Sequence, residues 1–389
     1  MVVVYPFISE EQKMTVATIR EFVSKEVVPV ASALEARNEY PWALVDRFKE
    51  MGLFGCIIPQ EYGGLGMGFA TYALVVEEVA AGWMSLVGLF NTHLIMAYIV
   101  MNHGTPEQKR GLLPAMARGE KRGGLALTEP DTGSDVQAIR TSATRQGDHY
   151  VLAGSKMFLT NGRNGNTFAL LARTNPSATP AHRGLSCFIV EKGPGFVVGA
   201  DADKVGYRSI DTCQIFLEEM PVAAATLVGG KEGRGFSQVM DGLEVGRINV
   251  AARAVGVARA AHEASLRYAQ QRHTFGKPIA QHQSIQIRLA DMAVNLEAAR
   301  LLTHTAATRK DMGEPCGLEA AMAKLFASET SLSGTMEAMR IHGGYGFTKD
   351  LPIERFYRDA PLMVIGEGTN EIQRLIIARK VLERHRVSP

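Results

Sequence analysis

The pattern of amino acids along this chain changes character twice, and that order restricts the folds available to it. Residues 1 to about 120 show helical spacing, residues 121 to about 228 hold short runs of β-forming residues, and helical spacing returns from about residue 229. An α–β–α order with a β insert is uncommon. We therefore predict a mainly helical α+β multidomain chain: an all-α domain (1–120), a small antiparallel β domain (121–228) built as a barrel or sandwich, and a helical bundle (229–389).

Local signals support the first two parts. Ser9 followed by Gln12 is a capping-box pattern that predicts a helix start. Pro41 suits the first turn of a second helix, and a third is expected from about Thr71. Gly147-Asp148 predicts a hairpin turn in the middle part. Strands are expected in four β-rich runs, at residues 150–152, 167–172, 185–190 and 214–217.

Long amphipathic stripes characterise the last part. One stripe steps by four, three and four residues, through Ile285, Leu289, Met292 and Leu296. A second keeps similar spacing through Met322, Leu325, Leu332, Met336 and Met339. Such stripes are typical of helices that pack in a bundle.

Size, charge and cysteine usage exclude several classes of protein. The 389 residues are too many for one small core and predict two or three packed domains. A net charge of +2 argues against a nucleic-acid partner held by phosphate neutralisation. The four cysteines are scattered without a CxxC spacing, so we expect buried free thiols in a reducing compartment. No histidine pattern suggests a metal site, and we expect none.

We also expect no membrane partner. The most apolar window, residues 86–101, is interrupted by Asn91, Thr92 and His93, so it predicts a buried helix rather than a membrane span. The N-terminus lacks the basic start and apolar core of a signal peptide, and residues 386–389 carry no recognised targeting address. A cytoplasmic protein fits these features best.

Near the end of the chain, one carboxylate stands between two glycines. Gly366-Glu367-Gly368 follows an apolar segment and precedes a helix that Thr369 or Asn370 can cap. The adaptable backbone lets Glu367 project into a cavity, where apolar walls would raise its pKa and poise it as a base near neutrality. Taken alone, the segment favours an ordinary acidic residue in a first helical turn, stabilised by the helix dipole.

Two segments of the middle part carry residues that suit a bound cofactor. The segment 126–135 offers hydroxyls and a glycine that can present donors to a planar heterocycle and to phosphate oxygens. Phe158 and Thr160 are two apart in a predicted strand, so the ring can stack while the hydroxyl donates from the same face. A polar loop capped by Asp135, and a core phenylalanine beside a surface threonine, are the plain alternatives.

Two further segments lie in the last part. Arg272, with a nearby hydroxyl and the amide of Gln283, suits a pyrophosphate and an adenine. The glycine-rich turn that begins at Gly343 would let the backbone approach a ligand closely. Each segment read singly would be a helix–loop–helix break or a tight turn.

Together with Gly366-Glu367-Gly368, these four segments resemble the acyl-CoA dehydrogenase family, and the resemblance covers nearly the whole chain. It implies an N-terminal helical domain, a middle antiparallel β-barrel and a C-terminal four-helix bundle. It also implies a homotetramer, with FAD extended between the middle and C-terminal domains. Electrons would pass to an electron-transferring flavoprotein.

The family pattern implies a role for each matching residue. Flavin and phosphate contacts fall on Leu125, Leu127, Thr128, Gly133 and Ser134, and ring contacts on Phe158 and Thr160. Contacts to the FAD of a neighbouring subunit fall on Arg272, Thr274, Phe275, Gln283, Arg340, Gly343 and Gly344, and contacts near the base on Thr369 and Glu371. Contacts to the acyl-CoA fall on Ser134, Glu244, Arg247, Gly366 and Gly368.

The resemblance also implies the chemistry. Glu367 would remove an α proton of a CoA thioester while the β hydride passes to flavin N5, giving the trans-2-enoyl-CoA. Hydrogen bonds to the thioester oxygen, from the Glu367 backbone N–H and an FAD hydroxyl, would stabilise the developing enolate. Some relatives carry the base just before the arginine that corresponds to Arg247; here that position is Gly246, so Glu367 is the candidate base. Glu244 matches a position near the CoA, or is a solvated helical carboxylate.

Two departures from the family pattern bear on specificity. Arg340 stands where relatives carry glutamine, and either contacts the FAD pyrophosphate or points to solvent. Gly366 stands where straight-chain relatives often carry tyrosine, which leaves room beside the α carbon. We expect a branched, cyclic or aryl-bearing acyl group of short to medium length, in a pocket whose floor residues 93–101 shape.

Three alternatives stay open at this stage. An acyl-CoA oxidase would pass electrons to O₂ on the same fold, although the chain ends at Pro389 without the extra helical domain of many oxidases. An acyl-acyl-carrier-protein dehydrogenase would use a different carrier. A non-catalytic family member would be expected to lose the base or the flavin segments, which this chain retains.

Overall fold

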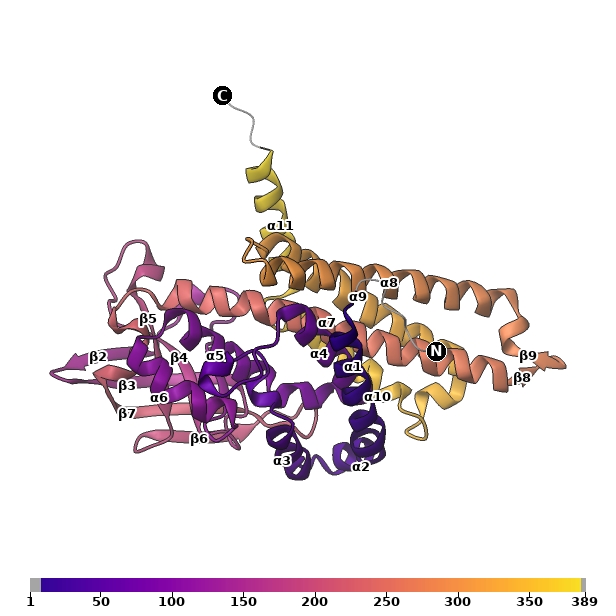
Figure 1. Cartoon of the computed structure of the whole chain (residues 1–389), viewed down its shortest axis with the longest axis horizontal. Coiled ribbons are helices and arrows are strands. Elements are labelled where there is room, and N and C mark those ends of the chain that lie inside the picture. The colour runs from indigo at the N-terminus through magenta and orange to yellow at the C-terminus, as the bar shows by residue number, and fades with distance from the viewer. Residues whose placement is uncertain (1–7, 386–389) are drawn as a thin grey trace.

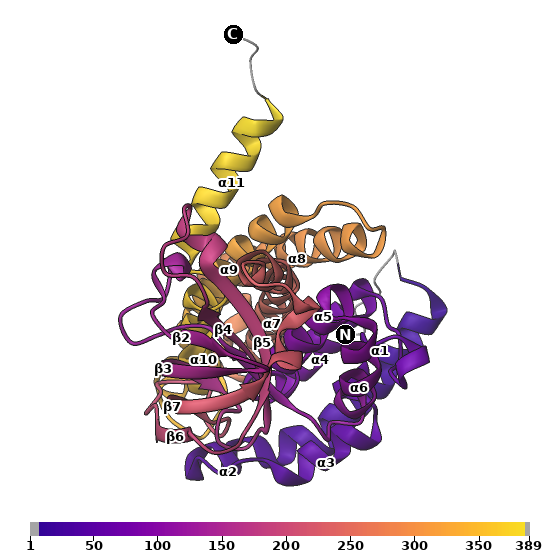
Figure 2. The same cartoon turned by 90° about the vertical axis from the view of Figure 1, so that its left-hand side faces the viewer.

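The computed structural model describes residues 8–385 and contains the three parts that the sequence predicts, a helical part, a β-rich part and a second helical part (Figures 1 and 2). The predicted boundaries at 120 and 228 fall between elements: α6 ends at Ala117 and β1 begins at Gly123, and α7 begins at Gly235. These boundaries stay predictions. Residues 386–389, in which the sequence shows no targeting address, lie outside the described residues, as do residues 1–7.

The N-terminal part is a set of helices. Ser9 caps the first helix as predicted, since its side chain accepts a hydrogen bond from the backbone N–H of Gln12 and Gln12 reciprocates. The helices are α1 (Glu10–Phe22), a π turn (Val23–Val27), α2 (Val28–Arg37), α3 (Trp42–Glu50), α4 (Phe69–Trp83), a 3₁₀ segment (Met84–Leu89), α5 (Asn91–His103) and α6 (Pro106–Ala117).

The apolar window at 86–101 is not one helix, because it divides between the 3₁₀ segment and α5. Both pieces are buried, as predicted. Within the described residues, one segment, Phe69–Leu89, is long and apolar enough to cross a membrane by length and composition. The structure buries 94% of its most apolar stretch, which is typical of the core helix of a folded domain.

The middle part is one open sheet of seven strands in the order β1-β4-β2-β3-β7-β6, with β5 paired to β4. The strands are β1 (Gly123–Ala126), β2 (Ser142–Gln146), β3 (His149–Thr160), β4 (Thr167–Arg173), β5 (Leu185–Glu191), β6 (Phe196–Asp201) and β7 (Thr212–Ala223). All four predicted runs lie in strands, and Gly147-Asp148 closes the β2–β3 hairpin.

The sheet corrects one expectation, because it is mixed rather than purely antiparallel. β1 runs parallel to β4, and Ser142 of β2 pairs with Arg173 of β4 in the parallel sense. The β-rich runs in the sequence locate strands, but strand direction depends on the path between them, and here the β2–β3 hairpin lies between β1 and β4. Because β1, β5 and β6 each pair with only one of the described strands, the sheet does not close into a full barrel and forms a half-barrel.

The C-terminal part is the predicted helical bundle. Its elements are α7 (Gly235–Gln271), a small hairpin of β8 (His273–Thr274) and β9 (Lys277–Pro278), α8 (Gln283–Asp311), α9 (Gly317–His342), α10 (Ile353–Ile365) and α11 (Asn370–Arg384). The helix α9 packs against all four other helices. Both views show α11 projecting away from the body of the molecule (Figures 1 and 2).

One predicted stripe does not form the buried face of its helix. In α8, Met292 and Leu296 are buried as expected. In α9, Met336 is 40% exposed, whereas small residues such as Ala323 and Ala327 are fully buried. Because α9 is surrounded by other helices, small side chains permit the close backbone approach that large ones would prevent.

The longest helix, α7, connects the two ends of the molecule. Its first residue, Gly235, lies against Ser186 and Cys187 in β5, and its last turn leads into the β8–β9 hairpin. At 1.5 Å per residue its 37 residues span about 55 Å. The sheet and the β8–β9 hairpin therefore lie at opposite ends of the molecule (Figure 1).

Gly256 allows α7 to approach α4 closely. A Cβ at this position would lie 2.4 Å from the carbonyl oxygen of Glu77 and 2.8 Å from Cβ of Ala80. Both contacts are closer than packed atoms tolerate. Gly111, in the helix α6, has no atom within 4 Å of an added Cβ.

We therefore predict that Gly256→Ala lowers the free energy of unfolding by about 1–3 kcal/mol, because one helix must shift to admit the methyl group. Gly111→Ala should leave stability unchanged or raise it by up to about 1 kcal/mol, since alanine favours the helix. Thermal unfolding of both variants measures the contrast. Equal melting temperatures for the two would contradict the tight α4–α7 contact.

Candidate active site

Glu367 lies in the short loop between α10 and α11. The helix α10 ends where the Gly366 N–H donates to the Leu362 carbonyl at 2.7 Å, and Thr369 caps α11 by accepting from the Ile372 N–H at 3.4 Å. Glu367 itself has φ +56°, in the left-handed region that non-glycine residues seldom adopt. Such a conformation costs of order 1 kcal/mol or more and persists only where the surroundings hold it.

The carboxylate of Glu367 lies against α7. A Cβ built on Gly246 would stand 2.7 Å from Oε2 of Glu367 and 2.9 Å from Cδ1 of Ile95. Any larger residue at position 246 would therefore displace the carboxylate. Asn91, at the start of α5, donates to Oε1 across 3.5 Å, a long hydrogen bond. Two residues of α5, Asn91 and Ile95, thus lie beside Glu367, and the role of residues 93–101 in shaping the pocket floor stays a prediction.

The surroundings favour a base that can take up a proton. Burial raises the pKa of the Glu367 carboxyl above its usual range. The positive charges of Arg253, Arg247 and Lys324, and the hydrogen bond from Asn91, act in the opposite direction. The Glu367 carboxyl therefore binds a proton more tightly than usual, while the three nearby cations still stabilise its ionised form.

The two predicted acyl-CoA contacts on α7 differ in environment. Burial lowers the pKa of the Arg247 guanidinium, and its buried Nε has no hydrogen-bond partner among residues 8–385. Glu244 is not a freely solvated carboxylate, because its Oε1 accepts from Nζ of Lys310 at 2.9 Å and from the Cys316 thiol at 3.1 Å. Arg247 thus keeps donor capacity for a ligand, whereas Glu244 is already bonded.

The predicted flavin residues of the middle part follow β1 and are fixed by β3. The Met157 N–H donates to the Thr128 carbonyl at 2.7 Å, and Nζ of Lys156 donates to the Leu127 carbonyl at 3.1 Å. An added Cβ on Gly133 would lie 4.0 Å from the Thr128 methyl group, so this segment folds back on itself. The remaining members of the group are Leu125, half-buried in β1, and Ser134, which is exposed.

A buried ion pair anchors this segment. Lys156 is fully buried, and its Nζ also donates to Oε1 of Glu129 at 2.9 Å. Glu129 in turn accepts from the backbone N–H groups of Arg140 and Thr141, at 2.7 and 2.8 Å. Burial lowers the pKa of Lys156 to about 8, although Glu129 favours its charged form. Through these bonds Glu129, in the loop after β1, is attached both to β3 and to the backbone at Arg140 and Thr141.

Phe158 and Thr160 do not follow the simple alternation assumed for them. The β3–β7 register shifts between Lys156 and Leu159, and Phe158 has φ +58°. A bulge of this kind re-aims side chains, so a spacing of two does not fix a common face. Phe158 is nonetheless 59% exposed, which is unusual for a phenylalanine in a β domain and leaves its ring available to stack.

The second group of predicted cofactor residues meets at the other end of α7. A cavity of about 570 Å³ brings together Arg272, Thr274, Gly343 and Gly344. Phe275 is 95% exposed. Gln283, the first residue of α8, is also exposed, as are the positions of the cavity's two glycines. The structure therefore gathers most of this group, although its members lie up to about 70 residues apart in sequence.

Three other predicted residues contact nearby parts of their own chain. Arg340 is ion-paired with Glu337 at 2.7 Å, one turn away on α9, and remains half-exposed. Glu371 is exposed and lies 3.5 Å from Arg374. In Gly368, φ is +86°, and its carbonyl accepts from the side-chain amide of Gln373 at 2.9 Å.

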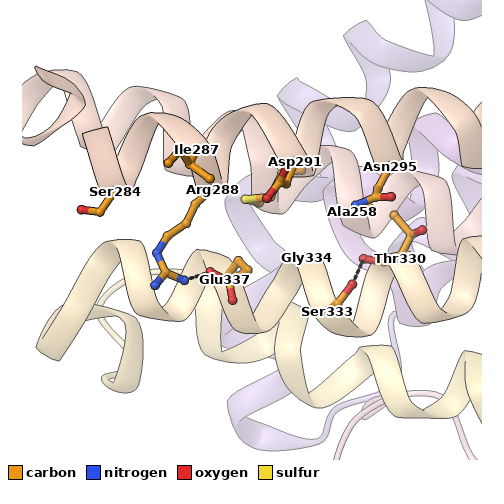
Figure 3. Close-up of a pocket in the computed structure, with 11 residues that line it drawn as sticks. Ala258, Ser284, Ile287, Arg288, Asp291, Asn295, Thr330, Ser333, Gly334 and Glu337 are labelled. Atoms are coloured by element: carbon orange, nitrogen blue, oxygen red, sulfur yellow. Dashed lines mark hydrogen bonds and ion pairs between the residues drawn. The ribbon is translucent and has the colours of Figure 1, made fainter. Parts of the chain in front are cut away.

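A second cavity lies apart from the predicted site. It has a volume of about 470 Å³ between α8 and α9, and none of the predicted residues lines it. Figure 3 shows Arg288 of α8 reaching across to Glu337 of α9, with which it forms an ion pair, while Thr330 and Ser333 face the same space. We therefore assign this cavity no part in the site.

Sequence reasoning missed several groups around Glu367. Asn91, Arg253 and Lys324 each interact with it, and no spacing pattern identified them. The one available signal was a charged residue in an otherwise apolar helix: Lys324 stands between Ala323 and Leu325, and the structure buries it completely. The four cysteines are buried and unpaired, as predicted.

Comparisons with known proteins agree with this geometry. Models of the acyl-CoA dehydrogenase N-terminal, middle and C-terminal domains match residues 9–120, 124–220 and 233–382. An acyl-CoA dehydrogenase of Bacillus subtilis (strain 168) is 41% identical over 377 residues, covering 96% of this chain and 99% of its own. A 3-(aryl)acrylate reductase of Clostridium sporogenes is 38% identical over 379 residues, covering 97% and 100%.

Solved structures are similar over the same length. The butyryl-CoA dehydrogenase of Megasphaera elsdenii has a TM-score of 0.93 at 35% identity, covering 96% of this chain and 99% of that one. A structure described as the electron transferring flavoprotein of Acidaminococcus fermentans, from work on flavin-based electron bifurcation, has a TM-score of 0.94 at 38% identity, covering 96% and 98%.

The buried pair of Lys156 and Glu129 yields a prediction. Lys156→Met should lower the free energy of unfolding by about 3–5 kcal/mol, because it leaves Glu129 buried without a counter-charge. The double variant Lys156→Met/Glu129→Gln removes that charge and should recover part of the loss. Chemical denaturation of the two proteins makes the comparison, and a single variant as stable as the wild type would contradict the assigned pairing.

Proposed function

Because this chain belongs to the acyl-CoA dehydrogenase family, and is an oxidoreductase of that type, we propose that it converts a short- to medium-length acyl-CoA to the trans-2-enoyl-CoA with Glu367 as the base. We further propose that the acyl group is branched, cyclic or aryl-substituted. The observation that carries the proposal is the position of Glu367, whose carboxylate lies against Gly246 of α7. Burial raises its pKa there, and positively charged side chains surround it.

The family is FAD-dependent, and the residues of this chain fit that cofactor. In the cavity at the end of α7, an added Cβ on Gly343 or Gly344 would meet no atom within 4 Å, so the backbone can approach a ligand closely. Arg272 in the same cavity can bind a pyrophosphate. We propose that the exposed ring of Phe158 stacks on the flavin and that the Thr160 hydroxyl donates to it. Bound FAD would supply the acceptor for the hydride that leaves the β carbon.

The two groups of cofactor residues support a shared site. One group follows β1, and the other lies beyond the C-terminal end of α7, at the opposite end of the molecule (Figure 1). One chain cannot bring both groups to one cofactor molecule across about 55 Å. We propose that a second copy contributes the Arg272 group, as in a homotetramer. Exposed apolar residues on α8 at intervals of seven, Ile287, Val294 and Leu301, offer a surface for that contact.

In the proposed reaction Glu367 acts as the base that removes an α proton of the thioester. Burial favours its protonated form after the transfer, while the nearby cations keep it ionised before. Its backbone N–H has no hydrogen-bond partner among residues 8–385, so it is available to the thioester oxygen as charge develops there. The contacts of Ile95 and Gly246 exclude water from the same place and strengthen both interactions.

Gly366 supports a substituent beside the α carbon. An added Cβ at this position would meet only the Leu362 carbonyl oxygen at 3.2 Å and the Leu362 Cδ1 at 3.8 Å. The space next to the base is therefore not filled by a side chain. The 3-(aryl)acrylate reductase among the relatives acts, by its name, on a ring-bearing acid, and the butyryl-CoA dehydrogenase acts on a short acyl group. The first supports a ring-bearing acyl group, whereas the second supports only the short length, because a butyryl group is unbranched.

We propose an electron-transferring flavoprotein as the redox partner, in keeping with the similar structure from work on such a protein. The 3-(aryl)acrylate reductase among the relatives is named for a reduction, the opposite direction to the reaction proposed here. Transfer to O₂ and use of an acyl carrier protein remain the competing proposals. We propose that the reaction takes place in the cytoplasm.

Replacing Glu367 tests its role as the base. In the FAD-loaded protein under anaerobic conditions, a branched acyl-CoA such as isobutyryl-CoA should bleach the flavin absorbance, and Glu367→Gln should abolish bleaching while retaining FAD. The rate of bleaching should rise with pH as Glu367 loses its proton, with a midpoint above the usual 4.5 because burial raises the pKa. Bleaching that survives Glu367→Gln would contradict the assignment of the base.

Replacing Gly366 tests the proposed specificity for the acyl group. Gly366→Tyr should reduce kcat/KM for 2-methylbutyryl-CoA and ring-bearing thioesters at least tenfold relative to unbranched butyryl-CoA, because the ring occupies the space beside the α carbon. Gly366→Ala is the matched control and should shift the ratio much less. The same panel tests the wild type: a clear preference for octanoyl-CoA over all branched and ring-bearing thioesters would refute the proposed acyl class.

A further inference from the structure

Lys324 is a fully buried cation on α9 whose charge acts on Glu367 but whose hydrogen bonds have no part in the proposed reaction. Its Nζ donates to the Val364 carbonyl at 2.9 Å and to Oδ1 of Asn370 at 2.7 Å. Among residues 8–385 no carboxylate forms an ion pair with it. Burying an ammonium group without a direct counter-charge is costly. The hydrogen-bond partners of Lys324 indicate its role in the structure.

The two partners of Lys324 flank the loop that carries Glu367. Val364 lies in the last turn of α10, and Asn370 is the first residue of α11. One ammonium group therefore bonds to both ends of the loop at the same time. This double attachment restricts how far the two helix ends can separate.

The attachment at Asn370 continues into α9. The Ser328 hydroxyl lies 3.2 Å from Oδ1 of Asn370, and the Asn370 side-chain N–H group donates to the Ser328 hydroxyl at 3.0 Å and to Oε1 of Glu329 at 2.9 Å. Asn370 is fully buried. The start of α11 is thereby bound to consecutive turns of α9, and its position cannot change independently of that helix.

Within the loop, Glu367 adopts its left-handed conformation, which needs an external constraint. The side-chain amide of Gln373 supplies one constraint on the inside of the loop, at the carbonyls of Glu367 (3.4 Å) and Gly368 (2.9 Å). Lys324 supplies the other, at the two ends. Without these attachments, a loop of this length would adopt other conformations and would not hold the Glu367 carboxylate against Gly246.

We propose that Lys324 is a positioning residue of the active site: by bonding to both ends of the loop, it holds the Glu367 carboxylate against Gly246 in the geometry that proton removal requires. The inference rests on the proposed role of Glu367 as base. Lys324 does not touch the substrate, and its effect passes through the loop.

Electrostatics adds a second consequence. Burial lowers the pKa of Lys324 to about 8, and the charge of Glu367 raises it, as do those of Glu371 and Glu329, while Arg247 lowers it. In the other direction, the positive charge of Lys324 lowers the pKa of Glu367. Losing Lys324 should therefore move the pH profile of proton removal to higher pH, because Glu367 would ionise less readily.

Three variants in the FAD-loaded protein separate positioning from stability. Lys324→Met removes both hydrogen bonds and the charge while keeping an unbranched apolar stem. Lys324→Gln keeps one donor without charge. Asn370→Ala removes one of the two attachments and leaves the charge in place. Anaerobic flavin bleaching by the preferred acyl-CoA, across pH, gives the rate and its midpoint, and bound FAD and the melting temperature give the structural comparison.

Lys324→Met should lower the bleaching rate by about 10- to 100-fold, as for a misplaced base, with little change in the concentration of substrate at half-maximal rate. Its pH midpoint should rise. Lys324→Gln should recover part of the rate, and Asn370→Ala should lose rate with a smaller shift of the midpoint. Hydrogen exchange should speed up in peptides covering 364–370 for Lys324→Met and Asn370→Ala.

The inference is overturned if folded, FAD-loaded Lys324→Met bleaches at the wild-type rate with an unchanged pH profile, whatever its melting temperature. Should Lys324→Met fail to fold or bind FAD, wild-type rates in both Lys324→Gln and Asn370→Ala would overturn it equally. Wild type and Glu367→Gln are measured alongside. If the wild type bleaches and Glu367→Gln does not, the role of the base stands independently of the result for Lys324.

Discussion

The contact between Glu367 and the glycine surface of α7 is the interaction on which the proposed site depends. Only a residue without a side chain at position 246 lets the carboxylate lie against the helix, since a Cβ would stand 2.7 Å from Oε2. The same contact removes the carboxylate from water and raises its pKa. Position and acidity of the base therefore have one physical cause, the close approach of a loop to a helix.

The rest of the fold holds the two sides of that contact in place. On one side, α7 is fixed by its packing against α4, where Gly256 permits a close backbone approach. On the other side, Lys324 of α9 bonds to both ends of the loop that carries Glu367. Gln373 of α11 bonds to a carbonyl within the loop. The left-handed backbone of Glu367 is stable because these attachments are made from outside the loop.

The predicted cofactor residues show how far a sequence resemblance reaches. The resemblance assigned two groups of residues to the cofactor, and the structure gathers four members of one group, Arg272, Thr274, Gly343 and Gly344, in one cavity. The spacing of Phe158 and Thr160 did not predict a common face reliably, because a bulge in β3 changes the register between Lys156 and Leu159. Residues two apart share a face only in a regular strand, and the sequence does not reveal where a strand contains a bulge.

The sequence by itself determined the order of helical and β-rich parts, the start of α1 at Ser9 and the hairpin at Gly147-Asp148, since each depends on neighbouring residues. Glu367 became the candidate base only through the resemblance of several segments along the chain to one family. Tertiary structure decided what depends on distant ones: the parallel pairing of β1 with β4, the alanine-lined buried face of α9, and the burial of Lys324 beside the loop. Glu244 makes the same point, because its partners Lys310 and Cys316 lie more than 60 residues away in the chain. Local sequence specifies backbone conformation, but long-range packing specifies which charges are buried and what they contact.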